Sequence, residues 1–207
     1  MLLANFQPYV ATEVIGCPDP TLNQAIVMAA IEFCRESQAW TETLDPILLL
    51  NGVRDYELDV PTDAYLYTVR DVWVGLRLLT PRVQIEVEQG ATSSEPAFYN
   101  MAADRTMLSV YPVPASVTGS AMVVRTTLTP TAAAKTLPDF LGQRYMEAIT
   151  SGAKARLMAM PGVPWSNPQL AVYYKSILDA AVLSARIEEA HDRVPGPIFV
   201  RPRSFGF

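Results

Sequence analysis

The chain has 207 residues, half of them hydrophobic and 18% charged, with a formal net charge of -5. This length fits one large domain or two small lobes, and the apolar content argues against disorder over most of the chain. The acidic balance argues against a protein whose main task is to grip DNA, because such proteins carry a basic excess or a basic face. We expect no signal peptide and no membrane segment, since no apolar run approaches the roughly 20 residues that span a bilayer.

The first predicted helix begins at Asp19 and ends near Trp40. Asp19 is a good N-cap, and Pro20 suits the first helical position, where its missing N–H costs nothing. Apolar residues then recur at helical spacing, at Leu22, Ile26, Ala29 and Phe33. Further apolar positions widen this stripe, so we expect a helix that is buried on more than one side.

Residues 41–136 are rich in Val, Thr, Tyr, Leu and Ile, and turn residues interrupt them at short intervals. Strands are predicted at 56–60, 65–79, 83–87, 106–111 and 121–127. The dipeptide Asn51-Gly52 is a strong signal for a two-residue hairpin turn. Short strands with closely spaced turns are typical of an antiparallel sandwich or a small barrel.

Two further helices are predicted after the strands. The first opens near residue 137 and runs to about residue 160, where a proline-rich turn ends it. The second begins with Asn167 as N-cap and Pro168 at the first helical position, and it stops before Pro195. Because only a short turn joins the two helices, we expect an antiparallel pair.

The last stretch, residues 194–207, holds three prolines and two glycines, so it cannot continue the helix. We expect an extended tail, which can add a strand to a neighbouring protein or lie in a groove. A tail packed on its own domain, or a disordered one, is the alternative. Its apolar anchors and basic side chains are Ile198, Phe199, Val200, Arg201, Arg203, Phe205 and Phe207.

The predicted fold class is therefore α+β. A small helical bundle is expected from residues 1–40 and 137–193, with an antiparallel β-sandwich or barrel inserted at 41–136. Residues 194–207 form the extended tail.

Residues that carry catalysis or bind metals are few. The one histidine, His191, lies among charged residues near the end of the last helix and is interpreted as part of a solvated face. Glu188 and Glu189 diverge on that helix, and Cys17 and Cys34 give no zinc pattern. The sequence also lacks a phosphate-binding loop and a nucleophile elbow. We expect no enzymatic activity, no cofactor and no metal.

The β region contains a set of arginines and a set of aromatic residues, and each set has two interpretations. The arginines could follow nucleic acid, but acids lie among them, so salt bridging is favoured: Arg70, Arg77, Arg82 and Arg105. Strict alternation places Tyr65, Tyr67 and Trp73 on one strand face. That face is either a ligand platform or part of the core.

A series of local motifs, taken in order, carries a family resemblance. It starts with Leu108-Ser-Val-Tyr-Pro-Val-Pro and Val123-Val-Arg-Thr-Thr-Leu-Thr-Pro. It continues with Leu137-Pro-Asp-Phe-Leu, Tyr145-Met-Glu-Ala-Ile-Thr-Ser-Gly-Ala and Pro161-Gly-Val-Pro-Trp-Ser-Asn-Pro. The series resembles the head-to-tail adaptor (tail tubular, or head–tail connector) proteins of short-tailed bacteriophages. The resemblance runs from about Asp19 to the C-terminus and is strongest from Leu137 to Arg186.

The resemblance implies a structural virion protein that forms a twelve-subunit ring between the portal and the tail nozzle. Its partners are then other copies of itself, the portal, the nozzle, and DNA that passes without sequence recognition. The tail residues above become the candidate portal-docking segment. Trp165 becomes a candidate contact with the adjacent subunit, with a plug under the interhelix turn as its alternative. The alternative function is a β-sandwich module that binds a carbohydrate or protein ligand.

Overall fold

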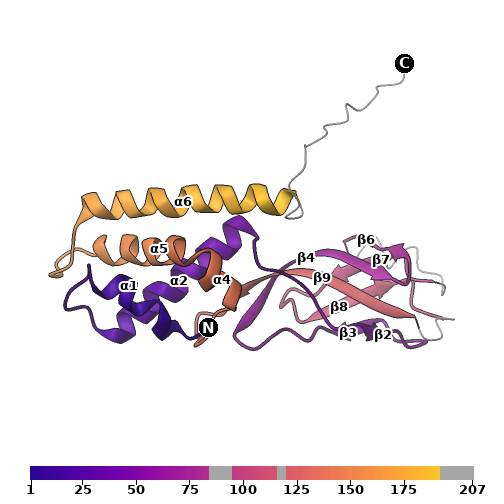
Figure 1. Cartoon of the computed structure of the whole chain (residues 1–207). Coiled ribbons are helices and arrows are strands. Elements are labelled where there is room, and N and C mark those ends of the chain that lie inside the picture. Colours follow the sequence, from indigo (N-terminus) through magenta and orange to yellow (C-terminus); the bar gives the residue numbers. More distant parts are fainter. Residues whose placement is uncertain (84–94, 116–119, 192–207) are drawn as a thin grey trace, which may run out of the picture.

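The computed structural model describes residues 1–83, 95–115 and 120–191, and its helices and strands occupy opposite ends of an elongated molecule (Figure 1). The helices are η1 (Leu3–Asn5), α1 (Gln7–Ala11), α2 (Asp19–Ser37), α4 (Asp139–Arg144), α5 (Met146–Met158) and α6 (Pro168–Ala190). The strands are β1 (Thr41–Thr43), β2 (Ile47–Leu48), β3 (Asp55–Glu57), β4 (Ala64–Val74), β5 (Arg77–Leu78), β6 (Thr80–Pro81), β7 (Phe98–Met101), β8 (Met107–Tyr111) and β9 (Ala121–Pro130).

The predicted first helix is present as α2, with different ends. Pro18 is the N-cap, so Asp19 is already helical and makes no capping hydrogen bond. Its carboxylate lies in the first turn, where it complements the helix dipole. The helix ends before Trp40, because Gln38 adopts the left-handed conformation and its N–H donates to the Cys34 carbonyl at 3.0 Å.

The second predicted helix is divided in two. Tyr145 leaves helical geometry, with φ at -126°, and separates α4 from α5. Helix α5 lies between α2 and α6, and every residue from 148 to 153 is buried. Gly152 permits this close packing, since a Cβ there would lie 3.0 Å from Ala29 Cβ. The helical part therefore has α5 at its centre.

The last predicted helix, α6, is confirmed at both ends. The Asn167 side chain accepts a hydrogen bond from the Leu170 N–H at 3.2 Å, Pro168 opens the helix, and Ala190 ends it before Pro195. Helix α6 runs back along α5, as the short connection predicts (Figure 1). The sequence did not predict η1 and α1, which bury Phe6 and neighbouring apolar residues against the helices.

The strands form two open sheets. One is five-stranded and antiparallel in the order β1-β9-β4-β5, with β2 also pairing with β9. The other has the order β3-β8-β7-β6, and its β6–β7 pair is parallel. Among the described residues neither sheet closes, so the barrel alternative is wrong. Buried residues of both sheets belong to one hydrophobic cluster that continues into the helices.

The hairpin predicted at Asn51-Gly52 is also wrong. The turn itself exists, with Gly52 at a φ of 79°. Its flanking strands join different sheets, however, because β2 pairs with β9 and β3 pairs with β8. The turn therefore carries the chain from one sheet to the other.

The strand predicted at 65–79 is broken and bulged. Gly75, with a φ of 58°, turns the chain so that β5 folds back on β4. Two register shifts interrupt the pairing of β4 with β9. As a result Leu66, Val69 and Val72 contact the core at intervals of three residues instead of two. Most of the strand predicted at 83–87 lies outside the described residues.

Candidate functional site

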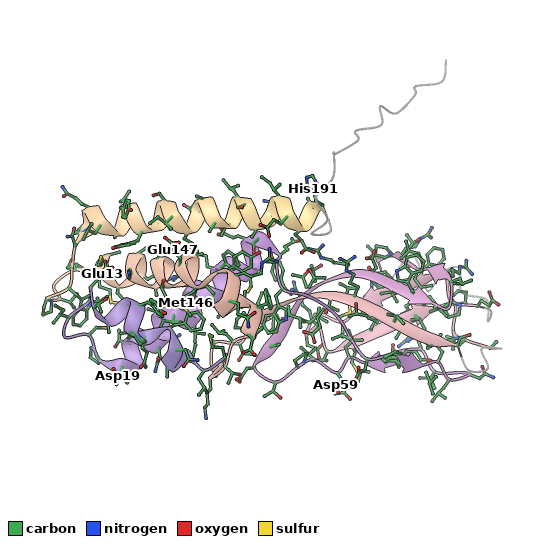
Figure 2. The ribbon with its side chains drawn as sticks, in the orientation of Figure 1. Glu13, Asp19, Asp59, Met146, Glu147 and His191 are labelled. Atoms are coloured by element: carbon green, nitrogen blue, oxygen red, sulfur yellow. The ribbon has the colours of Figure 1, made fainter. Side chains whose placement is uncertain are left out.

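The expected portal-docking tail lies outside the described part of the chain, with all seven of its candidate residues: Ile198, Phe199, Val200, Arg201, Arg203, Phe205 and Phe207. The last described residue lies three positions before the tail. His191 follows α6 at the end nearest the strands (Figure 2). Its N–H donates to the Ile187 carbonyl at 3.2 Å.

A buried ion pair fixes the end of α6 to the sheet. The Glu189 side chain is only 5% exposed, and its Oε1 lies 2.8 Å from Nη1 of Arg70 on β4. The Thr41 hydroxyl donates to the same oxygen at 2.9 Å. Arg70 also donates to Thr127 Oγ1 at 2.9 Å and to the Gln38 carbonyl at 3.3 Å. These five residues, the α6 joint, connect the ends of α2 and α6 to β1, β4 and β9.

The prediction that the two adjacent glutamates diverge is confirmed, but it did not include the burial of Glu189. The two do diverge: Glu188 Oε2 accepts from Arg144 at 2.8 Å and from the Tyr145 hydroxyl at 3.2 Å. Glu189 instead falls on the buried face of α6 with Val182. Its helical phase was the available signal, because it continues the apolar stripe. Burial of a charge there requires a paired cation.

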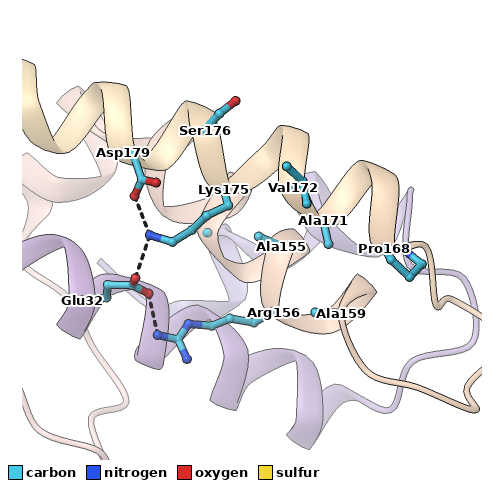
Figure 3. Close-up of a pocket in the computed structure, with 11 residues that line it drawn as sticks. Glu32, Ala155, Arg156, Ala159, Pro168, Ala171, Val172, Lys175, Ser176 and Asp179 are labelled. Atoms are coloured by element: carbon cyan, nitrogen blue, oxygen red, sulfur yellow. Dashed lines mark hydrogen bonds and ion pairs between the residues drawn. The ribbon is translucent and has the colours of Figure 1, made fainter.

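A groove of about 650 Å³ runs between α5 and α6 (Figure 3). Small residues such as Gly152 and Ala171 line it, and a charged network with Glu32 at its centre lies at one end. Glu32 receives hydrogen bonds from Lys175 at 3.0 Å and from Arg156 at 2.5 Å. Burial alone would raise the pKa of Glu32, but these two bonds outweigh it and hold the pKa below its usual range. The charges at this end thus compensate one another.

A second network ties the segment after α1 to the helix pair. Glu13 accepts a hydrogen bond from Lys154 Nζ at 2.6 Å and another from the Tyr174 hydroxyl. The bond from Lys154, followed by that from Tyr174, lowers the pKa of Glu13. The same contact with Glu13 raises the pKa of Tyr174 to about 12. Both networks have a structural character, because every charge in them is met by an opposite charge or a hydroxyl.

Three of the four arginines weighed in the β region have intramolecular partners. Salt bridging is confirmed for Arg70, as the α6 joint shows. Arg82 lies over the Phe98 ring at 4.0 Å from its centroid. Arg105 lies over the Tyr67 ring and donates to the Tyr67 carbonyl. These contacts place the guanidinium groups of Arg82 and Arg105 on aromatic rings of their own chain.

Trp165 lies in the turn between α5 and α6. Its side chain is half-buried and packs against the core, which agrees with a plug under the turn. The indole Nε1 is buried and has no hydrogen-bond partner among the described residues. The proposed contact with an adjacent subunit stays a prediction.

The aromatic residues weighed as a ligand platform do not form one cluster. Tyr65 and Trp73 are both exposed on β4, eight residues apart, which is roughly 25 Å along a strand. Tyr67 stands at the first bulge, between Arg35 and Arg105, each 5.6 Å from its ring centroid.

The outer face of the five-stranded sheet carries an apolar patch instead. Trp73 pairs with Leu78 on one side and with Val123 on the other, so these three side chains are lateral neighbours. Leu48 is exposed on β2, and Leu76, in the turn after β4, is 98% exposed. These five residues form what we call the sheet-tip patch, which lies at the end of the molecule away from the helices. Large exposed apolar patches are common at protein-contact surfaces.

The described residues hold no group of three or more His, Cys, Asp or Glu side chains that could bind a metal ion. In the same ranges, no helix is both long and apolar enough to cross a membrane.

Comparison with known proteins places the chain in a family. The model of the SU10 adaptor protein family matches residues 1–201, which is nearly the whole chain and includes both the helices and the strands. No curated protein matches the sequence. With the match extending over every described element, the chain belongs to the SU10 adaptor protein family, a family of phage head–tail adaptors.

Proposed function

We propose that this protein is a structural component of the virion neck that forms a ring between the portal of the head and the tail nozzle. The observation that carries the proposal is the family match over residues 1–201. An adaptor needs two surfaces for two different neighbours, and an elongated molecule with helices at one end and strands at the other supplies them (Figure 1). Its role is non-enzymatic, as is general in this family.

In this proposal the chain has three parts, which follow its secondary structure. Residues 1–40 and 137–193 act as a helical bundle, residues 41–136 as a β domain and residues 194–207 as a docking tail. The α6 joint supports a defined relation between the first two, because Arg70 and Glu189 join β4 to the last turn of α6. A ring subunit needs such a joint, since each copy must present its two ends at the same angle.

The tail makes the portal contact in this proposal. It begins three positions after His191, which lies next to the α6 joint. The sixteen residues after His191 would reach at most about 55 Å if fully extended. Ile198, Phe199 and Val200 would fill apolar pockets of the portal, followed by Phe205 and Phe207, while Arg201 and Arg203 pair with its acids.

The sheet-tip patch is the surface that we assign to the tail nozzle. Its exposed apolar side chains are those of Leu48, Trp73, Leu76 and Leu78, with Val123 half-buried beside them. DNA passes through the ring without sequence recognition. A net charge of -5 disfavours tight binding of DNA, so it favours movement of DNA through the channel. Neighbouring copies meet through heterologous surfaces that close by rotation, with Trp165 as one candidate contact.

Cosedimentation with the portal protein of the same phage genome tests the docking tail. The full chain is expected to sediment with the portal, and a chain truncated after Asp192 is expected to stay folded but free. Circular dichroism of the truncated chain provides the folding control. Equal binding by both chains would contradict the role of residues 194–207, and binding by neither would contradict the adaptor proposal itself.

A further inference from the structure

Helix α6 is apolar on two opposite faces. Its inner face packs on the other helices through Leu178, Val182 and Ala185, which are buried. Its outer face exposes residues spaced alternately by four and three: Gln169, Tyr173, Ser176, Ala180, Leu183, Ile187 and Ala190. This outer stripe contains no charge, and Leu183 and Ile187 are each 61% exposed. A helix that is apolar on both faces is usually covered on both.

The spacing of the outer stripe is that of a coiled-coil seam. Alternating steps of three and four residues keep one line of side chains facing a partner helix over several turns. Figure 1 shows α6 on the outside of the helical part, with α5 on its inner side. No described residue covers the stripe, so this face is open to a partner.

We propose that the outer stripe pairs antiparallel with the same stripe of a second copy of this chain. In that arrangement each layer joins a large side chain to a small one. Tyr173 meets Ala190 of the second copy, Ser176 meets Ile187, and Ala180 meets Leu183, with the same layers repeated by symmetry. A parallel pair would set Leu183 against Leu183 and Ala180 against Ala180, which leaves alternating crowded and empty layers.

The charged residues beside the stripe also favour antiparallel pairing. Asp179 and Arg186 both lie on its flank, one residue before Ala180 and Ile187. Antiparallel pairing brings Asp179 of each copy beside Arg186 of the other, which gives two opposite-charge contacts. Asp179 already accepts a hydrogen bond from Lys175 on its own helix, and a carboxylate has acceptor capacity for a second donor. Parallel pairing would leave both charges opposite uncharged or basic residues.

The polar members of the stripe tolerate burial. The Ser176 hydroxyl donates to the Tyr173 carbonyl of its own helix at 2.7 Å, so burial of this hydroxyl leaves no unpaired hydrogen-bond donor. From Tyr173 to Ala190 the stripe extends about 26 Å. One helix face of this length buries less than the roughly 1,200 Å² typical of stable complexes. The pair therefore forms reversibly and depends on protein concentration.

Such a pair is a property of the free protein and goes beyond the proposed neck function. A two-fold contact closes at two copies and cannot by itself build a ring. The pair would cover the outer stripe before the protein binds the portal. Its test therefore uses the full chain without portal, and the result leaves the adaptor proposal untouched.

Sedimentation equilibrium measures the association. The mean mass of the full chain is expected to rise from one copy toward two as concentration increases. Ala180→Glu buries a charge in both central layers and is expected to weaken association at least about tenfold. Gln24→Glu adds the same charge to an exposed position of α2 and is the matched control. A chain that stays monomeric at every concentration, or an Ala180→Glu variant that associates like the control, overturns the proposal.

Disulfide trapping tests the orientation. Cys17 is replaced by serine, and Cys34 can stay because it is fully buried. Tyr173→Cys and Ala190→Cys are then made as separate variants. Mixing the two is expected to give a cross-linked heterodimer, while each alone gives little product. Efficient cross-linking of each variant with itself would show a parallel pair and overturn the antiparallel arrangement.

Discussion

Replacing Arg70 with alanine removes the cation that compensates the buried carboxylate of Glu189. Breaking a buried ion pair in this way costs about 3–5 kcal/mol. Because the Arg70 side chain is 22% exposed, against 5% for Glu189, the lower end of that range applies, at about 3 kcal/mol. With a urea dependence of roughly 2–3 kcal/mol per molar, the unfolding midpoint should fall by about 1–1.5 M.

Urea unfolding followed by circular dichroism measures this loss, and the neighbouring glutamate supplies the control. Arg144→Ala removes the pair with Glu188, whose side chains are 49% and 42% exposed, and should cost under about 0.5 kcal/mol. The double variant Arg70→Met/Glu189→Leu removes both buried charges and should recover most of the stability. A loss below about 1 kcal/mol for Arg70→Ala, or no recovery in the double variant, would refute the reasoning.

Three further predictions concern the helical part. Gly152→Ala should destabilise the fold by about 1 kcal/mol, because the crowding of a methyl group 3.0 Å from Ala29 Cβ exceeds the roughly 1 kcal/mol gain in helix propensity; a thermal melt checks this. Tyr174→Phe should remove the tyrosine that titrates near pH 12 in phenolate absorbance. Because the folded pKa of Tyr174 is raised, its contribution to stability should be full below about pH 10 and lost as pH rises toward 12, so the variant should lack this alkaline loss. Trp165→Phe should lower the free energy of unfolding by under about 1 kcal/mol, so the urea midpoint should change little. The indole N–H that it removes has no partner among the described residues.

Local signals predicted the helices well where capping and periodicity agree. Asn167 and Pro168 fix the start of α6, and the structure has both in those roles. The split at Tyr145 was not predictable, because apolar spacing continues across it from Leu141 to Ala148. Short elements without periodicity, such as α1, give too few residues for a pattern to appear.

Four of the predicted strands correspond to β3, β4, β8 and β9, whereas β1, β2 and β7 were not predicted. Asn51-Gly52 predicts a tight turn, and a tight turn is present. Which strands it joins depends on contacts far apart in sequence, here β2 with β9 and β3 with β8. The bulges of β4 change the facing of its residues for the same reason, so strict alternation does not hold from residue 65 to residue 73. Tyr65 and Tyr67 line one pocket, and Trp73 lies farther along the strand.

The candidate site was predicted only in part. Residues of the docking tail lie outside the described residues, so their role stays a prediction. The α6 joint was missed, because a pair of adjacent glutamates near a helix end usually faces solvent. Its discovery needed the partner Arg70, which is 119 residues away in sequence. The apolar outer stripe of α6 was present in the sequence, but its exposure is visible only in the fold.

Electron microscopy of the chain mixed with the portal protein of the same phage genome tests the central claim most directly. We predict a closed ring, twelve copies in number as the family resemblance implies, coaxial with the portal. Residues 194–207 should contact the portal, and the sheet-tip patch should point away from it toward the nozzle. Portal particles without a bound ring under every salt condition, or isolated copies that bind without closing, would contradict the account.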